Sequence, residues 1–282
     1  MAAQPSTQFW IDNAGEGFEA FERTPAPSLE FAVNESESGW NPDANAFATF
    51  SVGGAPARVE IVNRLKSGKE ATVYCCVART KDGDRLVAAK FFREFAARSF
   101  KNDAIYQEGR VRRGRAERAF RGRTAFGREV QLEGWVRREY EVLVRLHAAG
   151  ADVPRPYLLG DRYVLMEYLG TAEASAPLLQ RARLTPEQAR QVFDRVLANI
   201  RIFLAHDVVH GDLSAFNILW DGAQGRIIDF PQSVDPRHNT SAFFLLARDV
   251  ANVCRHFARY GIEASAADLA TDLWSAYVRR TR

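Results

Sequence analysis

The sequence predicts an α+β fold in which a small β-rich lobe is followed by a larger α-rich lobe. Three observations lead to this class. Strand-like runs gather between residues 57 and 92, and helix-like patterns dominate after residue 185. One helical pattern and one buried strand-like run connect the two regions. At 282 residues, 46% of them apolar, the chain is long enough to fill both lobes.

Residues 1–55 are expected to form an acidic, partly disordered N-terminal extension. The first 50 residues contain eight acids and one Arg, which leaves +10 on the remainder of a chain whose total net charge is +3. Scattered aromatic residues such as Phe9 and Trp40 indicate that parts of this segment dock on the basic body.

Features that report on compartment favour a soluble, cytoplasmic protein. No run of about 18 apolar residues occurs, and the amino terminus lacks a basic flank followed by an apolar stretch. The three cysteines, Cys75, Cys76 and Cys254, lack the spacing of metal ligands. We therefore expect a reducing compartment and no structural zinc site.

The β-rich lobe is assigned to residues 56–166. From Ala57 onward, three antiparallel strands are predicted by the runs "ARVEIVNRLK", "ATVYCCVART" and "RLVAAKFF", because "KDGD" is a hairpin turn signal. A basic flexible loop is expected near residues 93–128, since Lys101 to Arg128 alone carries nine bases and three acids.

Helical patterns follow. The stretch "LEGWVRREYEVLVRLHAAG" predicts a helix that stops at Gly150, and "RYVLMEYLG" predicts a buried strand. The α-rich lobe, residues 167–282, contains the clearest helix, with Thr185 as cap, Pro186 at the first helical position and Gln188 in capping-box place. After the short strand "GRIIDFPQ", two further helices are expected over residues 241–260 and 266–279.

Five polar residues stand where phosphoryl transfer would need them, in the order found in protein-kinase-like enzymes. Asp212 in "HGDLSAFNILW" would orient the attacking oxygen. Asn217 and Asp229 supply hard oxygen ligands for a metal ion, and Lys90 would hold phosphates while Glu139 fixes its ammonium group. Taken alone, a lysine in a strand is more often an edge residue and a glutamate on a helix is more often solvated, and the Asp of "HGDLSAFN" could be a turn former. Their joint order predicts a kinase-like bilobal fold with a reduced α-rich lobe.

The chain resembles the RIO family of atypical serine/threonine protein kinases over about residues 57–260. "SGKEATVY" resembles the Ser-Thr-Gly-Lys-Glu-Ala motif of that family. Later segments match in order: "FKNDAIYQEGRVRRG", "WVRREYEVLVRLHAAGADVPRP", "VLMEYLG", "VVHGDLSAFNILW", "IIDFPQSVD" and "RDVANVCRHF". Arg64, Leu65, Lys66 and Thr72 depart from the expected pattern, and "DFPQ" mixes features of different subgroups, so no subgroup is assigned.

The resemblance implies the site residues and cofactors. It implies ATP with Mg²⁺, or with Mn²⁺ in its place. It implies catalytic roles for Asp212 and Asp229, and metal ligation by Asn217 and Asp229. Nucleotide-contacting residues would be Ser67, Gly68, Lys69, Lys90, Glu139, Met166, Glu167 and Tyr168. Asp229 also matches an Asp that can become a phosphoaspartate, because a carboxylate near the γ-phosphate is capable of that attack.

Three functions remain open at this point. The first is a RIO-type kinase or ATPase that transfers the γ-phosphate of ATP to a protein Ser/Thr or to itself. The second is a small-molecule phosphotransferase of the aminoglycoside-kinase type, which also uses His-Gly-Asp followed by Asn. The third is a switch that binds ATP on a ribosomal particle or RNA through the basic loop, since clustered Arg attracts phosphate. The acidic extension would then regulate that loop. No membrane partner is expected.

Overall fold

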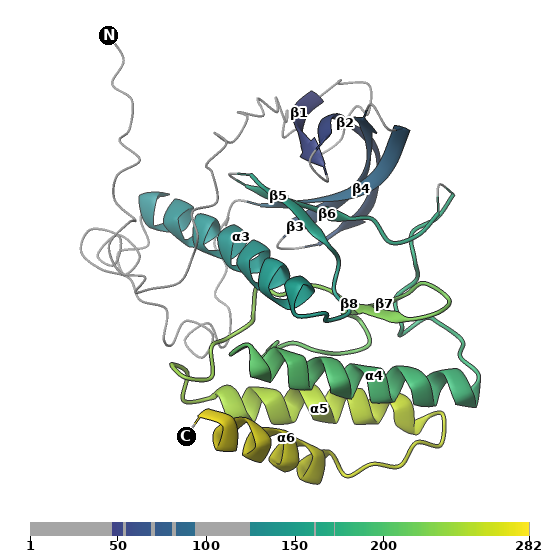
Figure 1. The fold of residues 1–282 in the computed structure, drawn as a ribbon, viewed down its shortest axis with the longest axis vertical. Coiled ribbons are helices and arrows are strands. Elements are labelled where there is room, and N and C mark those ends of the chain that lie inside the picture. Colours follow the sequence, from purple (N-terminus) through teal and green to yellow (C-terminus); the bar gives the residue numbers. More distant parts are fainter. Residues whose placement is uncertain are drawn as a thin grey trace.

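The bilobal α+β architecture predicted from the sequence is confirmed by the computed structural model (Figure 1). The structure describes residues 47–52, 55–68, 71–80, 83–93, 125–160, 162–171 and 173–281. Most of the expected acidic extension, most of the expected basic loop, and Lys69 lie outside these described residues.

The smaller lobe contains one antiparallel sheet with strand order β1-β2-β3-β4-β6-β5. The strands are β1 (Phe47–Val52), β2 (Ala55–Ser67), β3 (Ala71–Thr80), β4 (Gly83–Phe92), β5 (Pro156–Leu159) and β6 (Tyr163–Glu167). The three strands predicted from Ala57 are β2, β3 and β4. Because β1 lies within residues 1–55, the sheet begins inside the segment expected to be an extension.

The two faces of this sheet pack against different partners. Directly paired residues share a face, so the row Cys75, Ala88 and Met166 lies on one side. Ala88 and Met166 belong to the large apolar core that continues into the helical lobe, which makes this the inner face. Cys76 and Ala89 lie on the outer face, in a separate small cluster. Lys90, two positions after Ala88, therefore faces the other lobe.

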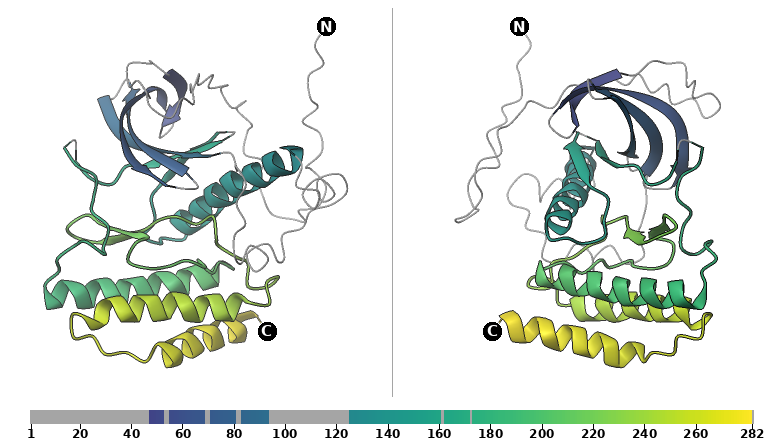
Figure 2. Two further views of the ribbon diagram at one scale, coloured as in Figure 1. Left: turned by 180° about the vertical axis from the view of Figure 1, so that it is seen from behind. Right: turned by 45° about the vertical axis from the view of Figure 1, so that its right-hand side comes forward.

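Helix α3 (Ala125–Ala148) lies beside β5 and β6, and its buried side chains belong to the core that continues into the larger lobe (Figures 1 and 2). It begins earlier than predicted, inside the expected basic loop, and Gly150 follows its end with a φ of 78°. The face toward the core buries Val136, Leu143 and Leu146. Glu139 is on the same buried face with 1% exposure, and a carboxylate so buried requires a partner.

The larger lobe stacks three helices below a short β-hairpin (Figures 1 and 2). They are α4 (Pro186–Ala205), α5 (Ala242–Ala258) and α6 (Ala266–Thr281), and the hairpin is β7 (Ile218–Trp220) with β8 (Gly225–Ile227). The capping box of α4 is confirmed: Gln188 N–H donates to Thr185 Oγ1 at 3.2 Å, and Thr185 N–H donates to Gln188 Oε1 at 3.0 Å. Within the described residues, none of the helices combines the length and apolarity required to traverse a bilayer.

Candidate active site

Lys90 lies at the centre of a cluster that joins the two lobes. Its Nζ is 2.7 Å from Oε2 and 2.8 Å from Oε1 of Glu139 on α3, and 2.5 Å from Oδ1 of Asp229, which follows β8. Lys90 and Glu139 side chains are 10% and 2% exposed, whereas the Asp229 side chain is 36% exposed. The structure therefore brings Asp229 together with Lys90 and Glu139, the pair that the sequence analysis expected, and Asp229 is the member that opens to solvent.

The contacts among Lys90, Glu139 and Asp229 shift the pKa of each of these side chains. Burial alone lowers the pKa of Lys90, but Asp229 and Glu139 raise it above its usual range, so the ammonium stays protonated. Burial alone raises the pKa of Asp229, but the charge and hydrogen bond of Lys90 hold it below its usual range. Burial raises the pKa of Glu139, although Lys90 opposes that shift. Asp229 is therefore an anion at neutral pH.

The backbone around Asp229 is held by α3 and by the loop of Asp212. Asp229 has a φ of 74°, a left-handed conformation that is uncommon outside Gly. The Phe230 N–H donates to Glu139, and the Ile228 carbonyl oxygen lies 3.1 Å from Nε2 of His210. Since strained backbone persists only where the surroundings enforce it, these contacts fix the direction of the Asp229 carboxylate.

Asp212 and Asn217 lie in one loop and bind each other. Asn217 Nδ2 donates to the Asp212 backbone oxygen at 2.7 Å and approaches its Oδ2 at 3.3 Å. Asp212 is solvent-accessible while Asn217 is buried. Partial desolvation raises the pKa of Asp212, Asn217 opposes the shift, and the nearby charge of Asp229 adds to it. Because the Asn217 amide nitrogen is used by Asp212, its amide oxygen is the atom available to a metal ion.

The loop rests on helix α5 through a residue that the sequence analysis missed. Asp249, with 2% exposure, accepts the N–H of Gly211 at 2.8 Å and the N–H of Leu213 at 2.9 Å. On the same helix, Arg248 donates to the Gly211 carbonyl, and Asn252 donates to the Leu213 carbonyl at 3.1 Å. Burial raises the pKa of Asp249 to about 7, although the two N–H bonds oppose the shift. The only sequence signal was the match of "RDVANVCRHF" to a family helix.

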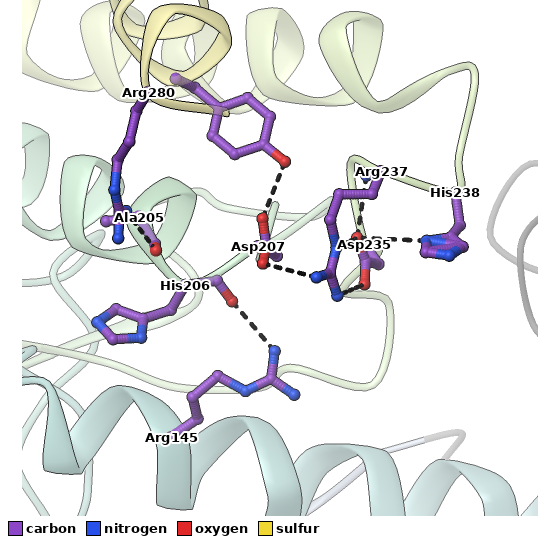
Figure 3. A network of polar contacts seen from close by, with 9 residues as sticks. Arg145, Ala205, His206, Asp207, Asp235, Arg237, His238 and Arg280 are labelled. Carbon is purple, nitrogen blue, oxygen red and sulfur yellow. Dashed lines mark hydrogen bonds and ion pairs between the residues drawn. The ribbon is translucent and has the colours of Figure 1, made fainter. Parts of the chain in front are cut away.

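A polar network anchors the chain on both sides of the site (Figure 3). Asp207, with a φ of 56°, lies between α4 and the Asp212 loop. It accepts a 2.9 Å hydrogen bond from the hydroxyl of Tyr277 on α6 and pairs at 3.1 Å with Arg237, which also binds Asp235 at 2.7 Å. Because Asp235 and Arg237 follow Asp229 in the chain, the network ties the two site loops to α6. Arg145 on α3 adds a bond to the carbonyl of His206.

The predicted phosphate loop is only partly described. Gly68 N–H donates to the Ala71 carbonyl at 2.9 Å and closes the turn between β2 and β3, whereas Lys69 at its tip lies outside the described residues. The Ser67 hydroxyl is 2.6 Å from Nη2 of Arg93, whose Nη2 also binds Oγ1 of Thr72 at 3.0 Å. Ser67 pairs with Thr72, and Thr72 pairs with Phe91 of the outer face. The Ser67 hydroxyl therefore lies on the opposite face of the sheet from Lys90.

The predicted adenine hinge lies at the end of β6, next to the inner face of the sheet. Met166 is buried opposite Ala88, and Glu167 N–H donates to the Arg155 carbonyl at 2.8 Å. The Tyr168 side chain hydrogen-bonds to Cys75, the residue paired with Ala88. Hence the three predicted hinge residues lie beside an apolar patch of the sheet, a surface suited to a flat aromatic ring.

Comparison with known proteins gives a direct family match. Residues 72–270 match the RIO domain family. The human serine/threonine-protein kinase RIO1 is 32% identical over 205 residues, which cover 72% of this chain and 34% of that protein. The RIO-type serine/threonine-protein kinase Rio1 of Thermoplasma acidophilum is 31% identical over 187 residues, which cover 66% of this chain and 92% of that protein. The chain thus spans about a third of the human relative but nearly all of the archaeal one.

Solved structures agree with the fold. The Rio2 kinase–ADP/Mg²⁺–phosphoaspartate complex of Chaetomium thermophilum aligns with a TM-score of 0.54 at 20% identity. The alignment covers 75% of this chain and 60% of that one. A second Rio2 kinase structure from the same organism gives a TM-score of 0.51 at 18% identity. At such identities the likeness concerns the fold alone, and it agrees with the sequence match. This chain belongs to the RIO domain family.

Proposed function

We propose that this protein is a RIO-type atypical serine/threonine kinase or ATPase. It transfers the γ-phosphate of ATP to a protein Ser/Thr, to itself, or through Asp229 to water. The observation that carries the proposal is the convergence of Lys90, Glu139 and Asp229 next to the Asp212 and Asn217 loop. Proteins of similar sequence are named serine/threonine-protein kinases, which supports the same reaction class.

Each residue in the cluster has a distinct role in this proposal. Lys90 contacts ATP phosphates, and Glu139 keeps its ammonium in place. Asp212 accepts a hydrogen bond from the attacking hydroxyl or water, a role that suits an accessible carboxylate with a raised pKa. Met166 and Glu167, with Tyr168, border the adenine. Gly68 brings backbone close to the phosphates, while Ser67 and Lys69 remain sequence-based candidates for phosphate contact.

The donor atoms fit Mg²⁺ shared with phosphate. Asn217 and Asp229 offer hard oxygen atoms, the type of ligand that Mg²⁺ prefers. Among the described residues, no group of three or more His, Cys, Asp or Glu could hold a metal ion by itself. Two protein ligands suit an ion that completes its shell with phosphate oxygens and water. When bound, Mg²⁺ would neutralise charge on the transferred phosphate, and Mn²⁺ could occupy the same site.

Asp229 is also suited to accept the phosphate. Its carboxylate is anionic, open to solvent, and held at fixed orientation by the backbone contacts described above. In this reaction, a carboxylate oxygen bonds to the γ-phosphorus while the bond to the β,γ-bridging oxygen breaks and ADP leaves. Water then hydrolyses the acyl phosphate and returns the carboxylate. The solved Rio2 kinase of Chaetomium thermophilum is a complex with ADP, Mg²⁺ and phosphoaspartate, which supports this variant of the proposal.

The test is incubation of the full chain with γ-labelled ATP and Mg²⁺, following free phosphate and label on the protein. Asp229→Ala is the test variant, and Asp194→Ala, on the exposed face of α4, is the matched control. We expect turnover by wild type and Asp194→Ala and none by Asp229→Ala. Label that hydroxylamine removes identifies the acyl phosphate, and stable label identifies transfer to Ser/Thr. Absence of both turnover and label in the wild type would contradict the proposal.

Partners and compartment follow the same proposal. We place the protein in the cytoplasm, supported by three buried free cysteines, Cys75, Cys76 and Cys254. We also propose a ribosomal particle or RNA as a partner of the basic segment, on the basis of its nine bases between residues 101 and 128. Salt-sensitive binding of the full chain to RNA would support this partner, and equal affinity at low and high salt would contradict it.

A further inference from the structure

Lys66, which departs from the family pattern, shares a face of the sheet with Lys90. Lys66 on β2 pairs with Val73 on β3, and Val73 pairs with Lys90 on β4. Directly paired residues project to the same side of an antiparallel sheet. Two strand spacings of about 4.8 Å separate Lys66 from Lys90, or about 10 Å in all. Both cations therefore project from the inner face.

An irregularity in β2 produces this orientation. Arg64 pairs with Tyr74 and Lys66 pairs with the next residue, Val73, so Leu65 is an extra residue in the strand. In a regular strand residues 64 and 66 would share a face, because side chains alternate with a period of two. The extra residue instead places Arg64 on the outer face with Tyr74 and turns Lys66 inward. The bulge separates two neighbouring cations onto opposite faces.

The charge balance of the cluster calls for such a cation. One ammonium, Lys90, is paired with two acidic side chains, Glu139 and Asp229, so its positive charge is already engaged within the cluster. A polyphosphate that approaches Asp229 would also meet the negative charge of that carboxylate. The Lys66 side chain is exposed and projects from the same face as Lys90, two strands away. Its positive charge is therefore on the side of the sheet where the terminal phosphate would lie.

We propose that Lys66 is a second phosphate-binding cation, held by the β2 bulge on the Lys90 face of the sheet, which contacts the terminal phosphate of ATP. This rests on the proposed ATP-dependent function and assigns a specificity role to this residue. Lys90 is neutralised by its carboxylate partners, whereas Lys66 forms no ion pair with another described residue. Its flexible stem lets the ammonium follow the phosphate. The chain should consequently distinguish ATP from ADP through Lys66.

The test is calorimetric titration of the full chain with a non-hydrolysable ATP analogue, ADP and AMP, with and without Mg²⁺. The variants are Lys66→Ala, Lys66→Arg and the matched control Arg64→Ala, which removes a cation from the other face of the same strand. Thermal unfolding of each variant reports whether the sheet is intact. For Lys66→Ala we expect affinity for the ATP analogue to fall about tenfold, equivalent to about 1.4 kcal/mol, with a smaller loss for ADP and none for AMP. Lys66→Arg and Arg64→Ala should retain the wild-type order.

Other outcomes overturn this inference in separable ways. Equal losses for all three nucleotides, or equal effects of Lys66→Ala and Arg64→Ala, would show that the cation acts through general electrostatics or stability. Unchanged affinities in Lys66→Ala would show that it does not touch the phosphate. If wild type binds no nucleotide, the proposed function itself fails and the inference fails with it.

Discussion

Replacing Lys90 should expose how strongly the buried cluster is coupled. Lys90→Met leaves Glu139, whose side chain is 2% exposed, without the ammonium that lies 2.7 Å away. Breaking a buried ion pair by removing one partner typically costs about 3–5 kcal/mol, because the remaining charge has lost both water and its partner. The 10% exposure of the Lys90 side chain places this pair in the buried regime.

The matching change is Glu139→Gln, which leaves Lys90 with Asp229 as its remaining charged partner. The double variant Lys90→Met/Glu139→Gln removes both charges and strands neither. We therefore expect the double variant to lose clearly less stability than the sum of the single losses, with a coupling free energy of about 2–3 kcal/mol. Asp229 contributes little to the cost in the double variant, because its side chain is 36% exposed and can be hydrated.

The assay is urea unfolding of all four proteins at pH 7, followed by circular dichroism and by tryptophan fluorescence. Trp135, buried one turn before Glu139, gives a local signal. Single losses that add to the double loss within about 0.5 kcal/mol would refute the coupling. Stability of Lys90→Met equal to that of wild type would refute the buried ion pair itself.

Three further predictions concern the loop beside this cluster. Asp212→Asn should lower turnover by about 10²–10⁴-fold, with the affinity for a non-hydrolysable ATP analogue retained; a parallel loss of affinity would contradict its role as orienting group. Burial lowers the pKa of His210 to about 4, against about 6.5 in an unfolded chain, so the unfolded state takes up its proton first as pH falls. The free energy of unfolding should therefore decline from pH 6.5 to about 4, by up to about 3 kcal/mol from this residue. In His210→Tyr the decline over this pH range should be smaller by that amount. Identical pH profiles of the two proteins would contradict the prediction. Asp249→Ala leaves the N–H groups of Gly211 and Leu213 without an acceptor, so it should lower the free energy of unfolding by about 1–3 kcal/mol for each group and also lower turnover. Urea unfolding and phosphate release measure the two effects. An unchanged urea midpoint would show that the contacts are dispensable.

Local sequence signals predicted the elements they encode. The capping box at Thr185 and Gln188 is a contact between residues three positions apart, so it needs no tertiary information. The antiparallel strands from Ala57 and the helices around residues 242–258 and 266–281 follow from periodicity in the same way. The joint order of the five polar residues along the chain, rather than periodicity, indicated that they form one site.

Tertiary contacts decided the features that the sequence left open. Asp249 reads as one polar residue on an amphipathic helix until the fold places it under Gly211 and Leu213. The bulge at Leu65 carries no Gly signal, so alternation counted from Arg64 would assign Lys66 to the wrong face. β1 pairs with β2 although it comes from the acidic, turn-rich segment, because pairing depends on an available strand edge.

The most direct test of the account is a crystal structure of the protein with Mg²⁺ and a non-hydrolysable ATP analogue. The account predicts the adenine beside Met166 and Glu167, phosphates within reach of Lys90, and a metal ion that contacts both Asn217 Oδ1 and the Asp229 carboxylate. An analogue bound away from the inner face of the sheet, or a metal ion that contacts neither residue, would contradict it.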